Sequence, residues 1–171
     1  AHIIATSKGE NRLKEKKGYI YESLDITNKA EVEEIIKKHS PDCVINTAAM
    51  TNVDTCETQR KECWALNVTA VENIVEALEN NPLPREKEIT GFGTPRLIHL
   101  STDFIFDGTS GPYNEKAVPN PLSYYALSKN ESEKVVFCSQ LKWAIARTML
   151  VYGVVDNMSR SNIVLWAKDI L

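Results

Sequence analysis

Tyr125 and Lys129 stand four positions apart in the segment YYALSK, and this spacing could support proton transfer. On a helix, residues four positions apart project from the same side, one turn from each other. A lysine ammonium beside a phenol favours the phenolate, so it would lower the pKa of Tyr125 toward neutrality. Such a tyrosine can protonate a carbonyl oxygen as hydride arrives at its carbon, or remove a hydroxyl proton in the reverse direction. The spacing alone recurs by chance in many proteins and needs a second feature beside it.

The second feature is an apolar run that ends in three polar residues, Ser101, Thr102 and Asp103. Ligands of open α/β sheets bind beyond the carboxyl ends of the strands, so a buried strand that stops in hydroxyl and carboxyl groups fits a ligand site. A turn in which the three side chains satisfy local backbone groups explains the triplet equally well. Tyr125 follows this strand by about twenty residues, and the two features together favour the ligand site. His99, inside the same apolar run, is predicted to be a hydrogen-bonded core histidine rather than a ligand.

Short apolar runs alternate with longer segments of helical period, and this alternation predicts the fold. Apolar residues recur on one side of the segments 28–39, 60–79 and 124–139, as in amphipathic helices. Strands buried on both faces and separated by helices indicate a parallel sheet flanked by helix layers. We therefore predict an α/β doubly wound, Rossmann-like fold. The predicted strands are 1–6, 19–26, 43–49, 96–101 and 143–153.

Such a fold carries a glycine-rich turn that cradles a dinucleotide, between its first strand and first helix. None of the seven glycines supplies it, because Gly91 and Gly93, the best-spaced pair, precede Pro95 and a strand. Since the sequence opens directly on a strand, we expect the first strand and its glycine turn to lie upstream of residue 1. We expect residues 1–156 to form an incomplete dinucleotide-binding domain and residues 157–171 to begin a truncated substrate domain.

Composition argues against several classes of partner. The 171 residues are 43% hydrophobic, and 20 Lys and Arg against 23 Asp and Glu give a net charge of −3. Because no block of like charges occurs, nothing electrostatic favours nucleic acid or a membrane surface. No apolar run reaches the length of a membrane span and no leader pattern is visible, so the cytoplasm is the expected compartment. The four cysteines lack the close CxxC pairs of a zinc site, and we expect no metal.

With these motifs in place, the sequence resembles the extended short-chain dehydrogenase/reductase superfamily and, within it, the dTDP-4-dehydrorhamnose reductase family. The resemblance runs from about residue 19 to residue 153. It implies a reductase of dTDP-L-rhamnose synthesis, which transfers hydride from NADPH to the C4 keto group of a nucleotide-linked 4-keto-6-deoxy sugar. The motifs that carry the resemblance are LDIT (24–27), VINTAAMTNVDTCE (44–57), LN (66–67), STDFIFDGTSGPYNE (101–115), PNPLSYYALSKNESE (119–133) and RTMLVYG (147–153).

The resemblance also implies a role for individual residues. Thr102 would hydrogen-bond the keto oxygen, Tyr125 would donate the proton, and Lys129 would orient the nicotinamide ribose and lower the pKa of Tyr125. Asp103 and Phe104 would border the substrate. Many rhamnose reductases have tyrosine at the position of Phe104 and 4,6-dehydratases have glutamate there, so a dehydratase is disfavoured. Further cofactor contacts are implied for Asp25, Ile26, Ala48, Ala49, Thr51, Asn67 and Ser101.

The choice of cofactor depends on Ser7, Lys8 and Arg12, which follow the first apolar run. An acidic residue at this place would bind the adenosine ribose hydroxyls and repel a phosphate, which favours NAD. The hydroxyl and the two cations suit the 2′-phosphate of NADP instead. Solvated loop cations explain Lys8 and Arg12 equally well. We expect NADPH, with NADH as the alternative.

Two other functions stay open. An NAD-dependent nucleotide-sugar epimerase would use the same tyrosine and lysine without net consumption of cofactor. The regulatory beta subunit of methionine adenosyltransferase resembles these reductases and acts as a binding partner, so a reductase-like fold need not mean a reductase. The combination of Thr102, Tyr125 and Lys129 favours an enzyme. The expected partners are a nucleotide-sugar substrate and, in a homodimer, a second copy of the chain.

Overall fold

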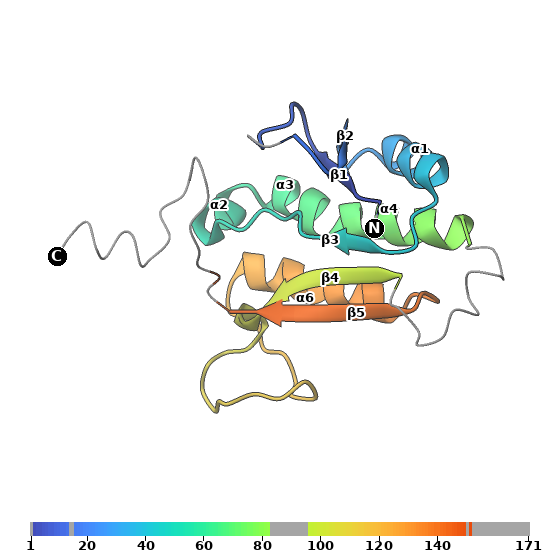
Figure 1. The fold of residues 1–171 in the computed structure, drawn as a ribbon. Helices are drawn as coiled ribbons and strands as arrows, with labels where there is room; N and C mark the ends of the chain where they lie inside the picture. The colour runs from blue at the N-terminus through green and yellow to red at the C-terminus, as the bar shows by residue number, and fades with distance from the viewer. Residues whose placement is uncertain (1, 14–15, 83–95, 150, 152–171) are drawn as a thin grey trace.

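All strands that the structure describes run parallel to their hydrogen-bonded neighbours, and helices join them, which confirms the predicted α/β class. The structure is a computed structural model that describes residues 2–13, 16–82, 96–149 and 151 (Figure 1). The elements are β1 (Ile4–Ser7), β2 (Ile20–Ser23), α1 (Lys29–His39), β3 (Val44–Asn46), α2 (Val53–Thr58), α3 (Arg60–Trp64), the π-helix η1 (Ala65–Thr69), α4 (Ala70–Asn80), β4 (Leu97–Thr102), the 3₁₀ turn η2 (Asp103–Ile105), α6 (Tyr124–Phe137) and β5 (Trp143–Thr148).

The strands form two sheets rather than the single sheet that we predicted. β1 pairs with β2 from Ile4 opposite Ile20, whereas β3, β4 and β5 form a second sheet in that order. In a doubly wound sheet of order 3-2-1-4-5-6, a break between these two groups falls where the first strand lies. The break therefore supports the expectation of a further strand, which stays a prediction. The predicted substrate domain from residue 157 lies outside the described residues.

The main hydrophobic core lies between the helices and one face of each sheet. Side chains of β4 alternate, so that Leu97, His99 and Ser101 are buried while Ile98 and Leu100 are only partly buried. The buried side chains face α6, which packs along β4 (Figure 1). The core cluster itself comprises Leu24, Val32, Ile36, Val71, Ile74, Val75, Ala77, Leu78, Leu97 and Val136.

Helix α6 carries the Tyr-x-x-x-Lys segment, and two side chains fix its first turn. Ser123 is the N-cap, and its hydroxyl accepts a hydrogen bond from the Ala126 amide at 3.2 Å. The Glu57 carboxylate on α2 accepts from the Tyr124 amide at 2.6 Å. Both bonds satisfy amides that have no partner within the helix. They hold the start of α6 beside the carboxyl end of β4.

The segment 60–79, predicted as one helix, is instead α3, the π-helix η1 and α4. Sequence periodicity could not show the interruption, because apolar residues recur at helical spacing on both sides of it. π-Helical turns are rare and are often found at functional sites. The buried Asn67 lies within this one.

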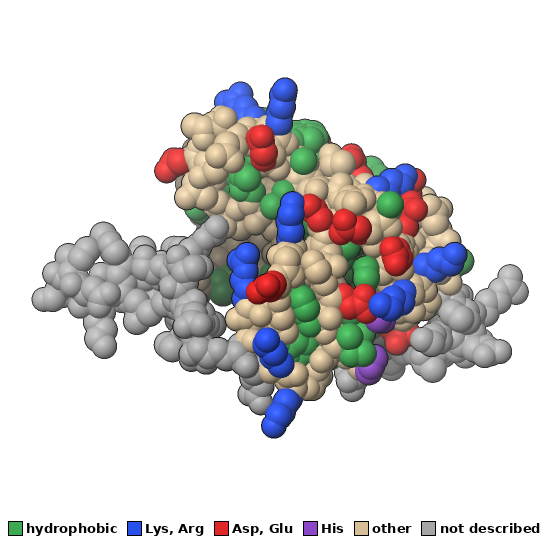
Figure 2. Space-filling model, turned by 90° about the horizontal axis from the view of Figure 1, so that it is seen from above, with side chains coloured by type: hydrophobic (Ala, Val, Ile, Leu, Met, Phe, Trp, Pro, Cys, Tyr) green, Lys and Arg blue, Asp and Glu red, His purple; other side chains and the backbone are tan. Residues whose placement is uncertain are grey.

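The surface carries charges of both signs. Figure 2 shows basic and acidic side chains interspersed on the face seen from above, without a large area of one sign. Within the described parts of the chain, no helix is long and apolar enough to cross a membrane.

Candidate active site

The carboxyl end of β4 and the first turns of α6 bring Thr102, Tyr125 and Lys129 together. Thr102 is 7% exposed, Tyr125 9% and Lys129 3%. The Thr102 hydroxyl lies close enough to the Tyr125 hydroxyl to lower its pKa. Phe104, the other aromatic residue here, lies edge-on to the Tyr125 ring, with the ring centroids 6.2 Å apart. Three of the residues predicted for catalysis and substrate binding, Thr102, Phe104 and Tyr125, thus lie next to one another.

Thr102 serves the local backbone as well. Its hydroxyl accepts from the Phe104 amide at 3.2 Å, caps η2, and donates to the Asp103 carboxylate at 3.3 Å. The turn that we considered as the alternative explanation for this triplet therefore exists, and it fixes the Thr102 hydroxyl where Tyr125 reaches it.

Burial raises the pKa of Tyr125 above its ordinary value of 10.0, although the hydrogen bond with Thr102 lowers it. The Asp103 carboxylate raises it further. Lys129 is not among the groups that act on this pKa. The expectation that Lys129 lowers the pKa of Tyr125 is wrong for this arrangement, because the ammonium is held elsewhere. Tyr125 is consequently protonated at neutral pH.

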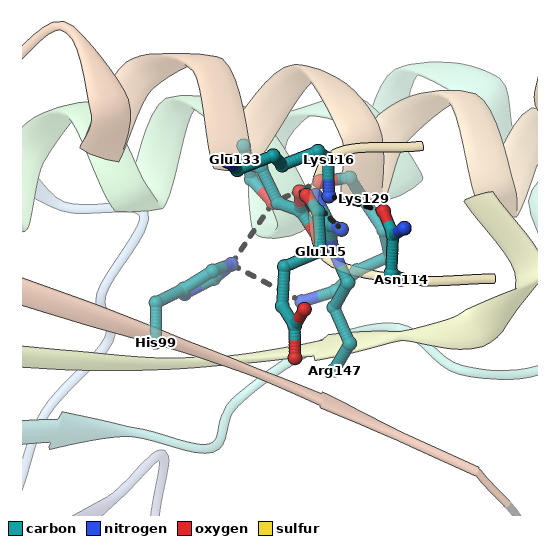
Figure 3. Close-up of polar contacts among 8 residues, drawn as sticks. His99, Asn114, Glu115, Lys116, Lys129, Glu133 and Arg147 are labelled. Atoms are coloured by element: carbon teal, nitrogen blue, oxygen red, sulfur yellow. Dashed lines mark hydrogen bonds and ion pairs between the residues drawn. The ribbon is translucent and has the colours of Figure 1, made fainter. Parts of the chain in front are cut away.

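Lys129 points to the backbone of β4. Its ammonium donates to the Leu100 carbonyl at 2.7 Å and lies 3.4 Å from Nε2 of His99 (Figure 3). Burial lowers the pKa of Lys129 from 10.5 to about 8, and the carboxylate of Glu133 opposes that shift. A group with such a pKa can lose its proton near the physiological range, as perturbed groups at functional sites often do.

Asn67 holds the segment after β3 against α6 rather than reaching toward open space. Its carbonyl oxygen accepts from the Met50 amide at 2.7 Å, while its amide nitrogen donates to the Met50 carbonyl at 3.0 Å and to Ser128 Oγ at 2.9 Å. The predicted direct cofactor contact of Asn67 finds no support in this geometry, because these bonds use the side chain. Ser128 was not predicted from the sequence. Its position directly before Lys129 is the one cue that could have pointed to it.

The predicted adenosine-side residues form a separate group after β1 and β2. Lys8 Nζ lies 2.5 Å from the Asp25 carboxylate, which also accepts from the Thr27 amide and hydroxyl. These bonds, with that of Lys8 first, lower the pKa of Asp25 to about 2. Ser7 Oγ is hydrogen-bonded to Tyr21 at 2.8 Å. Arg12 and Ile26 lie exposed or partly exposed, and so do the predicted cofactor-groove residues Ala48, Ala49 and Thr51, which follow β3.

Ser101 has a buried hydroxyl whose oxygen lacks a hydrogen-bond partner within the described ranges. An unsatisfied buried polar atom calls for an explanation such as a ligand. Ser101 lies two residues beyond His99, on the same side of β4. The residues present therefore fit a ligand that brings a polar group to Ser101 and Lys129.

An open cavity of about 1330 Å³ lies beside this cluster. Its lining includes Asp103, Phe104 and Ser123, together with Arg147 and Met149. Thr102, Tyr125 and Lys129 do not line it. Among the described residues, no group of three or more His, Cys, Asp or Glu side chains could hold a metal ion.

Several known proteins are similar to the chain in sequence or in fold. The sequence is 35% identical over 145 residues to methionine adenosyltransferase 2 subunit beta of Xenopus tropicalis, which covers 85% of the chain and 40% of that protein. It is 33% identical over 150 residues to the dTDP-4-dehydrorhamnose reductase of Aggregatibacter actinomycetemcomitans. This match covers 87% of the chain and 47% of that protein. The solved dTDP-4-dehydrorhamnose reductase of Bacillus anthracis, in complex with NADP, matches with a TM-score of 0.74 at 25% identity. The match covers 99% of this chain and 60% of the solved one.

The chain thus spans less than half the length of these two curated relatives. The family model described as the RmlD substrate binding domain matches residues 3–168, nearly the whole chain. Together with the parallel α/β fold and the motifs at β4 and α6, this match shows that the chain belongs to the RmlD substrate binding domain family.

Proposed function

We propose that the chain is part of a reductase that transfers hydride from NADPH to the C4 keto group of a nucleotide-linked 4-keto-6-deoxy sugar, as a dTDP-4-dehydrorhamnose reductase does. The observation that carries the proposal is the burial of Thr102 and Tyr125 next to each other at the carboxyl end of β4, with the Lys129 ammonium anchored at the neighbouring Leu100 carbonyl. The relatives named dTDP-4-dehydrorhamnose reductase, one of them solved with NADP, support both the substrate class and the nicotinamide cofactor.

The protonation of Tyr125 at neutral pH suits it to donate the proton in a reduction. Because burial raises its pKa, the phenol holds its proton at neutral pH and can give it to a substrate oxygen. Thr102 would turn its hydroxyl hydrogen from the Asp103 carboxylate to the same oxygen and polarise the carbonyl. An epimerase must first remove a hydroxyl proton, which requires Tyr125 to act as the phenolate.

Lys129 and Ser101 are the residues that would hold the nicotinamide half of the cofactor, which supplies the hydride when bound. Among the described residues, Leu100 is the one carbonyl acceptor of the Lys129 ammonium, so its other N–H groups would be available to ribose hydroxyls. Since the pKa of Lys129 is about 8, its charge is lost as the pH rises past that value.

A second candidate rests on the 35% identity to a methionine adenosyltransferase 2 subunit beta. In that case the full-length protein would be a binding subunit of a methionine adenosyltransferase. Both candidate functions are compatible with this fold, so the chemistry of the site must distinguish them. Three residues suited to carbonyl reduction, Thr102, Tyr125 and Lys129, favour the enzyme.

The deciding assay follows NADPH absorbance with the full-length protein and dTDP-4-keto-6-deoxy-L-mannose. The reductase predicts loss of absorbance that requires the sugar nucleotide, with a reaction lacking it as the control. NADP binding without oxidation, together with co-purification of a methionine adenosyltransferase, would overturn the reductase. Interconversion of epimers without net oxidation would point to the epimerase.

Lys8 is expected to set the preference for NADPH over NADH. Its side chain is 79% exposed, so its ion pair with Asp25 is screened by water and can give way to a 2′-phosphate. Lys8→Ala should raise KM for NADPH about tenfold through loss of one charge-assisted bond, and should change KM for NADH less than about twofold. Steady-state kinetics with both cofactors measure the two values.

Lys29→Ala is the matched control, because Lys29 forms an exposed ion pair with Glu76 on α1 and α4. It should leave both KM values unchanged. An equal rise in KM for NADPH and for NADH in Lys8→Ala would mean that Lys8 is a solvated surface cation without a role in cofactor choice.

A further inference from the structure

His99 is a buried histidine that touches the proposed machinery but has no part in it so far. It is fully buried on β4, between Asn46 of β3 and two residues of α6, Lys129 and Ser132. Nδ1 lies 3.3 Å from the Asn46 amide nitrogen, and Nε2 lies 3.0 Å from Ser132 Oγ and 3.4 Å from Lys129 Nζ (Figure 3).

The neighbours of the ring determine which nitrogen carries the proton. The backbone amide of Ala48 donates to Asn46 Oδ1 at 3.1 Å, and this bond fixes the orientation of the Asn46 side chain. Its NH₂ group therefore faces Nδ1 of His99, which must accept. The proton of the neutral ring is then on Nε2, which donates to Ser132 Oγ. Ser132 passes its own hydrogen to the Lys129 carbonyl at 2.7 Å, so the chain of donors and acceptors is consistent.

This tautomer changes what Lys129 can do. A protonated Nε2 has no lone pair for the ammonium 3.4 Å away, so the short distance is a contact between two donors. The Leu100 carbonyl, at 2.7 Å, is then the acceptor that anchors Lys129. With the opposite tautomer, Nε2 would accept a second hydrogen bond and occupy another N–H of the ammonium.

Burial and the neighbouring ammonium keep His99 neutral. Burial, and then the Lys129 ammonium, lower its pKa to about 3. The other charged group acting on Lys129 is Glu133 on α6, and Arg147 of β5 pairs with it at 2.7 Å. No charge change of His99 therefore accompanies turnover near neutral pH.

We propose that His99 is a positioning residue of the reductase: as the neutral Nε2–H tautomer, it holds the Lys129 ammonium at the Leu100 carbonyl without bonding to it, and leaves two N–H groups for a vicinal diol such as a ribose. The role in turnover rests on the proposed function. The tautomer of the His99 ring does not rest on the proposed function, because it follows from the contacts with Asn46, Ser132 and Ala48 alone.

The ring state is measured by long-range ¹H–¹⁵N NMR on the full-length protein, with His99 assigned through the backbone spectrum of β4. The inference predicts a neutral Nε2–H pattern that does not change from about pH 5 to pH 8. An Nδ1–H pattern, or a titration of His99 in that range, would overturn it. Oxidation of NADPH alongside an Nδ1–H pattern would refute the positioning role alone, and the Nε2–H pattern without oxidation would refute the proposed function alone.

The effect on Lys129 is measured with His99→Gln, whose carbonyl can accept from the ammonium. That bond stabilises the charged form, so the pKa of Lys129, followed by ¹³Cε NMR, should rise above the value of about 8. KM for NADPH should rise about fivefold to tenfold, because one N–H is now occupied, while kcat changes less than about twofold. His39→Gln is the matched control and should change neither quantity. An unchanged Lys129 pKa and KM in a folded His99→Gln protein would overturn the inference.

Discussion

Tyr125→Phe is expected to lower kcat for NADPH oxidation by about 10²- to 10⁴-fold, the range for loss of a general acid. The change removes one hydroxyl and keeps the ring, which packs with Cys56 and Cys63 and lies edge-on to Phe104. Thr102 keeps its bonds to Asp103 and to the Phe104 amide, so its position should not change. The variant loses the proton donor while the site around it persists. KM for NADPH and the melting temperature should stay close to those of the unchanged protein.

Tyr124→Phe provides the matched control, because it makes the same change at the preceding residue of α6. The Tyr124 ring packs against Trp64 and under the Arg60 guanidinium, away from Thr102. We expect this variant to retain at least half of kcat. If Tyr125→Phe kept more than about a tenth of kcat, another group would have to supply the proton. Steady-state kinetics on both variants, with the same sugar nucleotide, distinguish these outcomes.

The sequence predicted the parts of the site that depend on local pattern. The four-residue spacing of Tyr125 and Lys129 places both on one side of α6, and the end of a buried strand places Thr102 at the sheet edge. His99 was predicted as a hydrogen-bonded core residue, and its bonds to Asn46 and Ser132 confirm this.

The remaining features depend on packing between segments far apart in the chain. Lys129 is anchored by a backbone carbonyl of β4, which no side-chain pattern encodes, so its effect on Tyr125 was predicted incorrectly. Asn67 was assigned to the cofactor, whereas its partners Met50 and Ser128 become neighbours only when the π-helix packs on α6. The pairing of Lys8 with Asp25 likewise appears only once β1 and β2 lie side by side.

Arg147→Met should destabilise the protein by about 3 kcal/mol, because it leaves the buried Glu133 carboxylate without its cation. The guanidinium binds both carboxylate oxygens, with Nη2 2.7 Å and Nε 3.1 Å from them (Figure 3). The side chain of Glu133 is 7% exposed and that of Arg147 26%, so water cannot replace the lost pair at the glutamate. The pair also ties α6 to β5 one turn beyond Lys129. Urea unfolding of the full-length protein measures the loss.

Two further variants separate this buried pair from ordinary surface charge. Lys134→Met breaks the Lys134–Glu131 pair, which is 60% and 28% exposed, and should cost less than about 1 kcal/mol. Adding Glu133→Gln to Arg147→Met removes the uncompensated charge and should recover a large part of the lost stability. Equal losses in Arg147→Met and Lys134→Met would mean that Glu133 is hydrated despite its burial. In that case its carboxylate could not oppose the lowered pKa of Lys129 as this structure indicates.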